Sequence, residues 1–287
     1  MSRIREQKQR IEDIATARYI TGTLRDISAI ELGGLMQRFG TNSVFYSELT
    51  DLYRLVWHMA QRREQGQPER EKKVLYVAYT TNRHFYGALN YNTMQLFMEK
   101  TGTEDRCLII GDTGKRYWLT RAKKRKALEY MSFAGDMPTD DENKAFLEHI
   151  ERYDRVMVFY PRFVSVFTQE ADMVDITFQP SDTTTDKNST ESDAEFLLEP
   201  ELDEMIAFFN QQVRSALFER VLLETQLSRV SARLVKMDSA DQNAQKLLRK
   251  EGRVLRKAYT NIASRQMLET LVGYIQWHNK NKQPIAQ

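Results

Sequence analysis

The residues that come nearest to a catalytic motif are Gly111, Gly114 and Lys115, which follow an apolar run. A glycine-rich turn that ends in Gly-Lys is typical of loops that bind nucleotide phosphates, because its backbone amides and its lysine surround the phosphate oxygens. That chemistry needs the spacing G-x-x-x-x-G-K-[ST]. Here only two residues separate the glycines, and Arg116 stands where serine or threonine is required. We therefore interpret the segment as a tight turn after a strand and not as a nucleotide site.

No other group of residues has the spacing of a catalytic or metal site. The four histidines lie far apart along the chain: His58, His84, His149 and His278. The single cysteine, Cys107, lies in an apolar run, which favours a small buried residue over a nucleophile. The basic run at residues 123–126 is typical of a solvated helix face. No acidic residue has an apolar setting that would indicate a tuned general acid. The sequence thus predicts no catalytic, cofactor-binding or metal-ligating residue, and a protein that is not an enzyme.

The composition argues against several further classes of protein. The 287 residues include 42 lysines and arginines and 40 aspartates and glutamates, so the net charge is only +2. Such a balance gives no overall positive field for nucleic acid or for an anionic membrane surface. No apolar run approaches the roughly 18 residues of a membrane-spanning helix, and the first residues lack the apolar core of a secretory signal. With one cysteine, we expect a soluble protein of a reducing, intracellular compartment.

Three segments of different periodicity must position these residues. In residues 1–65, apolar side chains recur at steps of three, four and seven from Ile4 to Ile27, which predicts a long helix with one apolar stripe. Residues 66–200 alternate β-rich runs with helical segments, which predicts an α/β domain with a parallel sheet. The expected strands are 74–79, 106–111 and 155–160, and the expected helices are 89–100, 120–130 and 141–153. The polar residues 181–195 are expected to form a mobile loop.

Residues 201–287 carry the strongest periodic pattern. Between residues 201 and 283 there is no proline, and there are only two glycines. Apolar residues fill two heptad positions, one from Ile206 to Ile262 and the other from Phe209 to Val272. This predicts a coiled-coil helix on the order of 110 Å long, too long for a compact domain. We therefore predict an α/β protein with a long antiparallel coiled coil of N- and C-terminal helices and an inserted Rossmann-like α/β domain. Its parts are the helix 1–65, the α/β domain 66–200 and the helix 201–287.

Several motifs, in the right order along the chain, make this sequence similar to one known family. Residues 222–244 read LLETQLSRVSARLVKMDSADQNA, which resembles the C-terminal signature of the gamma subunits of F-type ATP synthases, the central rotor shafts of these complexes. Residues 81–90 occupy the place of the family's glycine-rich segment after the first strand, and Tyr153 and Asp154 precede the third strand as they do in the family. The chain is thus identified as a member of this family.

The same comparison shows where the chain departs from the family pattern. Gly22 and Leu24 stand in place of the usual lysine and methionine near the N-terminus. Tyr259 and Thr260 stand in place of an Arg-Gln pair that the family usually carries near the tip of the shaft. The resemblance therefore implies a divergent member.

The resemblance implies a non-catalytic subunit that couples proton-driven or sodium-driven rotation to ATP synthesis or hydrolysis. Its helix pair would lie inside a hexamer of alpha and beta subunits, and its α/β foot would dock on the epsilon subunit and the ring of c subunits. No cofactor and no nucleic acid is expected. The complex would hold the chain at the cytoplasmic face of a bacterial inner membrane. The resemblance favours this location over a mitochondrial or plastid one.

The resemblance also implies two groups of contact residues. The upper-shaft group, expected to touch the alpha–beta ring, consists of Leu24, Ile27, Ile262 and Gln266. The foot group, expected near the epsilon subunit and the c-ring, consists of Asn82, Arg83, Tyr86, Gly87 and Asn90.

Two other functions are weighed against this one. A non-rotary coiled-coil scaffold could carry an α/β insert that binds a small ligand, but it would not need the residue 222–244 signature beside the other matches. An α/β enzyme with helical oligomerisation arms would need convergent polar groups at the strand ends, which the sequence does not offer.

Overall fold

The computed structural model describes residues 2–61, 73–82, 86–121, 128–135, 137–177 and 202–280. The chain forms two compact units: residues 1–26 with 237–287, the smaller unit, and residues 27–236, the larger unit. The predicted contact at Arg83, the basic run 123–126 and the predicted loop 181–195 lie outside the described residues. The predicted domain boundaries near residues 65 and 200 also fall outside them and stay predictions.

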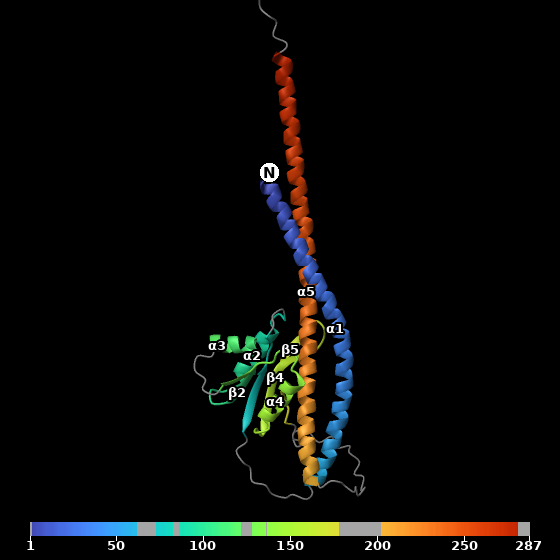
Figure 1. Ribbon diagram of the computed structural model, residues 1–287, viewed down its shortest axis with the longest axis vertical. Coiled ribbons are helices and arrows are strands. Elements are labelled where there is room, and N and C mark those ends of the chain that lie inside the picture. The colour runs from blue at the N-terminus through green and yellow to red at the C-terminus, as the bar shows by residue number, and fades with distance from the viewer. Residues whose placement is uncertain are drawn as a thin grey trace, which may run out of the picture. The chain divides into compact units, whose positions relative to one another are not determined.

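Two long helices carry the N- and C-terminal segments (Figure 1). Helix α1 runs Ser2–Gln61, and helix α5 runs Leu202–Lys280. In the larger unit, the Arg233 guanidinium donates to the Ser28 hydroxyl at 2.8 Å, and the Tyr53 hydroxyl donates to the Asn210 side chain at 2.5 Å. Residue numbers that rise along α1 therefore meet numbers that fall along α5, so the two helices are antiparallel in this unit.

The smaller unit shows the same direction of pairing. The Gln7 side chain donates to the Glu251 carboxylate, and Arg18 donates to Asp241 at 3.2 Å. The predicted antiparallel pairing of N- and C-terminal helices is thus confirmed in each unit.

A five-stranded sheet occupies the larger unit, with the strand order β3-β2-β1-β4-β5. Strand β1 pairs in parallel with β2 and β4, β2 pairs in parallel with β3, and β5 is antiparallel to β4. The strands are β1 Val74–Tyr79, β2 Arg106–Ile110, β3 Leu128–Met131, β4 Arg155–Phe163 and β5 Gln169–Asp175. Parallel neighbours need crossover connections, and three helices lie in them: α2 Leu89–Lys100, α3 Asp112–Arg121 and α4 Asp140–Ile150.

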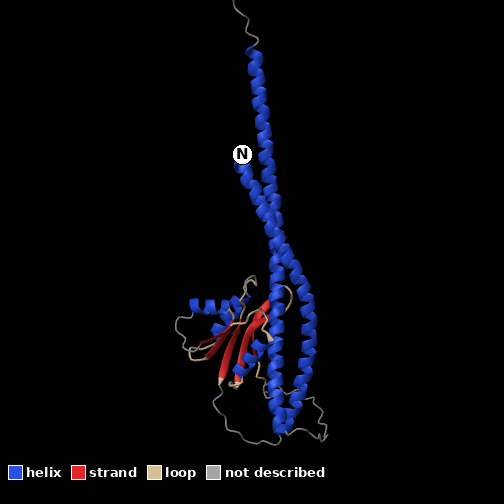
Figure 2. Ribbon diagram, viewed as in Figure 1, coloured by secondary structure: helices blue, strands red, loops and turns tan. Residues whose placement is uncertain are grey.

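Helices cover both faces of this sheet (Figure 2). Neighbouring residues of a strand point to opposite faces, so Val77 joins a core with Phe218 of α5, whereas Ala78 joins a second core with Phe97 of α2. The first core also includes α4 residues, and the second includes α3 residues. Cys107 is buried in the second core, as predicted. The mixed α/β fold with a mostly parallel sheet is therefore confirmed.

The predicted helix 120–130 is wrong. Helix α3 already ends at Arg121, and residues 128–131 form strand β3, which pairs with β2 so that Tyr130 lies opposite Ile109. Since β3 lies at the sheet edge, its side chains are exposed or half-buried, and the short run has no buried apolar pattern by which a strand could be predicted.

Candidate functional site

The Gly111 turn connects β2 to α3 and is built by close backbone approach. Gly111 has φ of 98°, and a Cβ there would lie 2.6 Å from the Thr80 carbonyl oxygen at the end of β1. Glycine alone fits this position without strain, because it has no Cβ. The sequence predicted a tight turn after a strand, and the structure adds that a helix begins directly after it, at Asp112.

The backbone amides after Gly111 already have acceptors within the chain. Asp112 donates to the Asn82 side chain at 2.9 Å, Thr113 to the Thr81 carbonyl at 3.1 Å and Gly114 to the Thr80 hydroxyl at 3.0 Å. A phosphate bound at a helix N-terminus uses such amides as donors, and here it would have to displace these bonds. The geometry therefore gives no support for a phosphate loop. The described residues also contain no group of three or more histidine, cysteine, aspartate or glutamate side chains that could hold a metal ion.

Four of the five foot residues are described, and most of them support the local structure. Asn82 donates to the Phe133 carbonyl at 2.5 Å, and Asn90 donates to the Thr81 hydroxyl at 2.8 Å. Tyr86 is only 4% exposed, and it belongs to a small cluster with an α2 and an α5 residue. Gly87, with φ of 61°, is exposed. A partner could therefore reach Gly87 directly, whereas the asparagines and Tyr86 shape the loop beneath it.

The upper-shaft residues are more accessible. Ile27 is 45% exposed on α1, and Ile262 is 41% exposed on α5. Gln266 is exposed, and Leu24 is half-buried. Their role as partner contacts stays a prediction.

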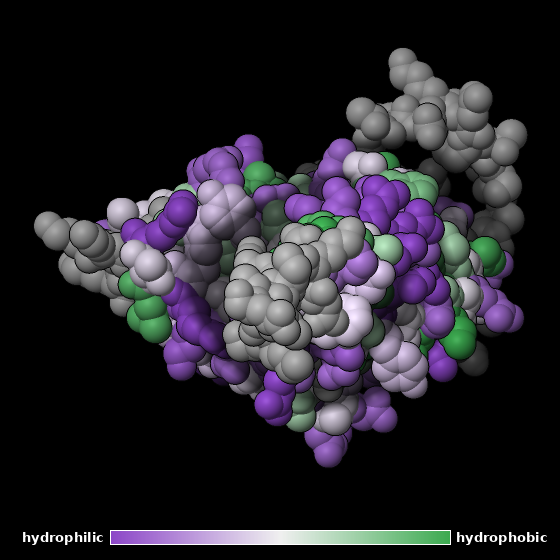
Figure 3. Space-filling view, turned by 90° about the horizontal axis from the view of Figure 1, so that it is seen from above, coloured by the Kyte–Doolittle hydropathy of each residue, from purple (hydrophilic) through white to green (hydrophobic). Residues whose placement is uncertain are grey.

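The C-terminal part of α5 exposes an extended apolar surface. Every residue from Asn261 to His278 is exposed, and we call this segment the exposed end of α5. Its large apolar side chains are 41–75% exposed: Ile262, Met267, Leu268, Leu271, Val272, Tyr274, Ile275 and Trp277. In the view of Figure 3, hydrophilic side chains predominate, and hydrophobic side chains form small separate groups among them. Large exposed apolar side chains gathered in one segment are typical of protein interaction sites.

The predicted heptad seam is wrong for this segment, since Ile262 and Val272 are exposed and none of the described helices covers them. Lys8 of α1 lies over the Tyr259 ring, 5.8 Å from its centroid. Helix α1 begins at Ser2, shortly before Lys8. Since α1 runs antiparallel to α5, it can pack on α5 only up to about the level of Tyr259. The heptad pattern thus continues beyond the helix that could pack on it.

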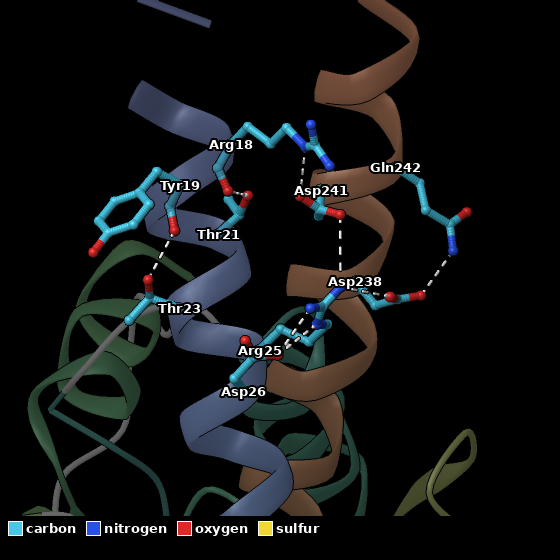
Figure 4. A network of polar contacts seen from close by, with 9 residues as sticks. All are labelled: Arg18, Tyr19, Thr21, Thr23, Arg25, Asp26, Asp238, Asp241 and Gln242. Atoms are coloured by element: carbon cyan, nitrogen blue, oxygen red, sulfur yellow. Dashed lines mark hydrogen bonds and ion pairs between the residues drawn. The ribbon is translucent and has the colours of Figure 1, made fainter. Parts of the chain in front are cut away.

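Below that level in the smaller unit, ion pairs join the two helices (Figure 4). The Asp241 carboxylate lies 3.2 Å from Arg18 Nε and 3.6 Å from a terminal nitrogen of Arg25. Arg25 also contacts Asp26 at 2.8 Å and Asp238 at 3.8 Å. Asp241 is only 16% exposed, so its two arginine partners compensate for its partial loss of water.

A buried acid in the larger unit was not predicted from the sequence. Glu224 of α5 is 6% exposed and accepts a hydrogen bond from the Tyr160 hydroxyl at 3.1 Å. Burial raises the pKa of Glu224 above its ordinary value, and burial together with the nearby Glu224 charge raises the pKa of Tyr160. In the same stretch, Arg229 is 2% exposed, with its guanidinium 4.7 Å from the centre of the Tyr79 ring. These contacts couple α5 to the sheet.

A family model described as ATP synthase matches residues 3–259. The ATP synthase gamma chain of Xanthomonas oryzae pv. oryzae is 25% identical to this chain over 94% of it and 97% of the relative. Among solved structures, a chain of the mitochondrial ATP synthase of Euglena gracilis matches with a TM-score of 0.53 and 18% identity, over 93% of this chain and 98% of that one. A chain from the central stalk and c-ring of the Tetrahymena thermophila mitochondrial ATP synthase matches with a TM-score of 0.55 and 15% identity. This match covers 77% of this chain and 99% of that one.

The structural matches establish the fold, and the family model establishes the relationship, because it covers most of the chain, from α1 through the sheet to Tyr259 of α5. The motifs at residues 81–90 and 222–244 lie inside the matched range. This chain therefore belongs to the ATP synthase gamma-chain family.

Proposed function

We propose that this chain is the central rotor subunit of a rotary ATP synthase, and that it couples ion-driven rotation to ATP synthesis or hydrolysis in an alpha–beta ring. Family membership over residues 3–259 supports this function, and the relatives that match nearly the whole length are ATP synthase gamma chains. The alternative of a non-rotary coiled-coil scaffold is not favoured, because such a scaffold would not be expected to match ATP synthase proteins over nearly its whole length.

The observation that carries the proposal is the exposed end of α5. Its apolar side chains need a covering partner, and hydrophobic contact is non-directional. A shaft held by such contact can turn within a ring without breaking directional hydrogen bonds at each angle. Ile262 and Gln266 lie in this segment, which agrees with their predicted contact with the alpha and beta subunits.

The α/β part of the larger unit is the proposed foot. The Tetrahymena match is a central stalk solved with its c-ring, and we extend that arrangement to this chain, with the epsilon subunit as the second partner. Among the described helices, none combines the length and the apolar character that crossing a membrane requires. The complex would then link the chain to the membrane, and we propose the cytoplasmic face of a bacterial inner membrane.

We further propose that the chain has no active site of its own. The amides of the Gly111 turn are occupied by the chain's own acceptors. The shaft would act on the ring by favouring one ring conformation at each angle, which is a shift of populations between existing states. The nucleotide chemistry would belong to the ring subunits.

The test is co-purification from cells that express the alpha, beta and epsilon subunits of the same complex. We expect one copy of this chain for three alpha and three beta subunits, and no ATP hydrolysis by the chain alone. Isolation without ring subunits, or hydrolysis by the chain that mutations within it abolish, would contradict the proposal.

A further inference from the structure

One buried carboxyl group connects helix α5 to the sheet in the larger unit. Glu224 accepts a hydrogen bond from the Tyr160 hydroxyl at 3.1 Å and another from the backbone amide of Phe163. Both donors belong to β4, and Glu224 and Tyr160 are each only 6% exposed. We call these three residues the Glu224 joint. Through it, a single side chain of α5 is bonded to two points of β4.

The positive charges near the joint already have other contacts. The charged groups that face the joint come from α5, β4 and β5: Arg220, Arg162 and Asp172. The Arg162 guanidinium pairs with Asp172 at 3.2 Å. The Arg220 guanidinium lies over the Tyr46 ring of α1, 5.0 Å from its centroid. Among the described residues, no cation forms an ion pair with the carboxylate of the joint.

A carboxyl group held in this way is more stable with its proton than without it. Two hydrogen bonds replace part of the water that the ion requires, but no ion pair offsets the rest of the loss. In agreement, burial raises the pKa of Glu224, and the hydrogen bonds and the two arginines offset this only in part. When α5 separates from β4, Glu224 reaches water and regains its ordinary affinity for a proton. Proton binding therefore favours the closed contact.

We propose that the Glu224 joint is a proton-sensitive contact between α5 and the sheet, and that it is most stable when Glu224 is protonated. The joint is then most stable below the ordinary pKa of 4.5 and loses stability as pH rises through the raised pKa. Between these two pKa values, the equilibrium constant for opening rises by up to about tenfold per pH unit. Burial raises the pKa of Tyr160 as well, so its hydroxyl remains a donor while Glu224 titrates.

The joint has a consequence for rotation. This consequence rests on the proposed function, in which the sheet belongs to the foot and α5 belongs to the shaft. Torque that passes between the sheet and α5 crosses the contact between them. A less stable contact lets the sheet turn further against α5 under the same torque. The chain would thus transmit rotation more stiffly at acidic pH than at neutral pH.

Hydrogen exchange of the Phe163 amide tests the joint directly, because this amide donates to the Glu224 carboxylate. Nuclear magnetic resonance of the full chain follows its exchange rate from about pH 4.5 to about pH 8. Division by the rate of a free amide at each pH gives the opening constant of the joint. Three variants are compared with wild type: Glu224→Gln, Tyr160→Phe and, as the matched control, Glu219→Gln. The control removes the same charge from an exposed position of α5.

The three variants should differ in their dependence on pH. We expect the wild-type opening constant to rise with pH by up to about tenfold per pH unit, and the control to match it. In Glu224→Gln the constant should stay low at every pH, because glutamine keeps an acceptor but cannot ionise. In Tyr160→Phe the rise should extend to higher pH, because the lost donor stabilises the charged carboxylate more than the neutral acid.

Three results would overturn the proposal. They are a wild-type pH profile in Glu224→Gln, an unmoved profile in Tyr160→Phe, and exchange of Phe163 at the same rate as the amides of β2 at every pH. The last result would mean that the larger unit opens only as a whole. Since the experiment needs no ring subunits, any of these results would leave the proposed function standing. Failure of the chain to assemble with a ring would instead contradict the proposed function and leave the joint in place.

Discussion

Leu227→Ala should destabilise the larger unit strongly. Leu227 is 1% exposed and packs in one cluster with Leu32 and Leu35 of α1 and Val230 of α5. Truncation of a fully buried leucine costs about 2–5 kcal/mol, because apolar contacts are lost and a cavity remains. With about 3 kcal/mol lost, and roughly 2–4 °C per kcal/mol for a protein of this size, the melting temperature should fall by about 6–12 °C.

Leu268→Ala is the matched control. It removes the same atoms from the same helix, but Leu268 is 62% exposed in the end of α5, so its cost in the isolated chain should stay within about 0.5 kcal/mol. The assay is thermal unfolding of both variants followed by circular dichroism at the helix band. In the reconstituted complex the order should change, because Leu268 is then proposed to contact the ring and its truncation should speed dissociation. A similar fall in melting temperature for both variants of the isolated chain would refute the packing described here.

Three further predictions concern single positions. Burial raises the pKa of Glu224 above its ordinary 4.5. The folded state therefore binds the proton more tightly than the unfolded state, and the stability of the fold decreases as pH rises from 4.5 towards the raised pKa. The Glu224→Gln variant should thus melt at a higher temperature than wild type at neutral pH, with a smaller gain or none at acidic pH. Asp241→Asn removes the carboxylate between Arg18 and Arg25. It should lower the free energy of unfolding, measured in urea, by about 1 kcal/mol, and by less at high salt. An unchanged free energy at low salt would contradict the ion pairs. Gly111→Ala should lower the free energy of unfolding by about 1–3 kcal/mol, because residue 111 has φ of 98°. Gly252→Ala, at a position with open space around it, should instead raise it by up to about 1 kcal/mol. Equal effects of the two substitutions would show that the turn is not strained.

The terminal helix pair was predictable because its signal is long and repetitive. Heptad apolar positions and an absence of proline between residues 201 and 283 leave few alternatives to a continuous helix. The strand 74–79 was equally clear, since a central parallel strand is buried on both faces and reads as one apolar run. Edge strand β3 has no such run, and its assignment depends on pairing with β2, which a local pattern does not contain.

The candidate contact surfaces were only partly predictable. A heptad pattern predicts which face of a helix can pack against a partner helix. How far along α5 that partner reaches depends on where α1 begins and on the register between the two helices. That register depends on contacts such as Arg18 with Asp241. Glu224 was missed for a related reason. In the larger unit α5 packs against both α1 and the sheet, so polar residues that would be exposed on a two-helix coiled coil become buried.

The proposed function requires this chain to turn within an alpha–beta ring. Cys107 is buried, so a cysteine introduced by Lys144→Cys at an exposed position of α4 offers a selective attachment point for a probe on the foot. With the ring immobilised, addition of ATP should make the probe rotate in one direction and should leave it still when hydrolysis is inhibited. Steady ATP hydrolysis by the assembled complex while the attached probe remains stationary would contradict the account.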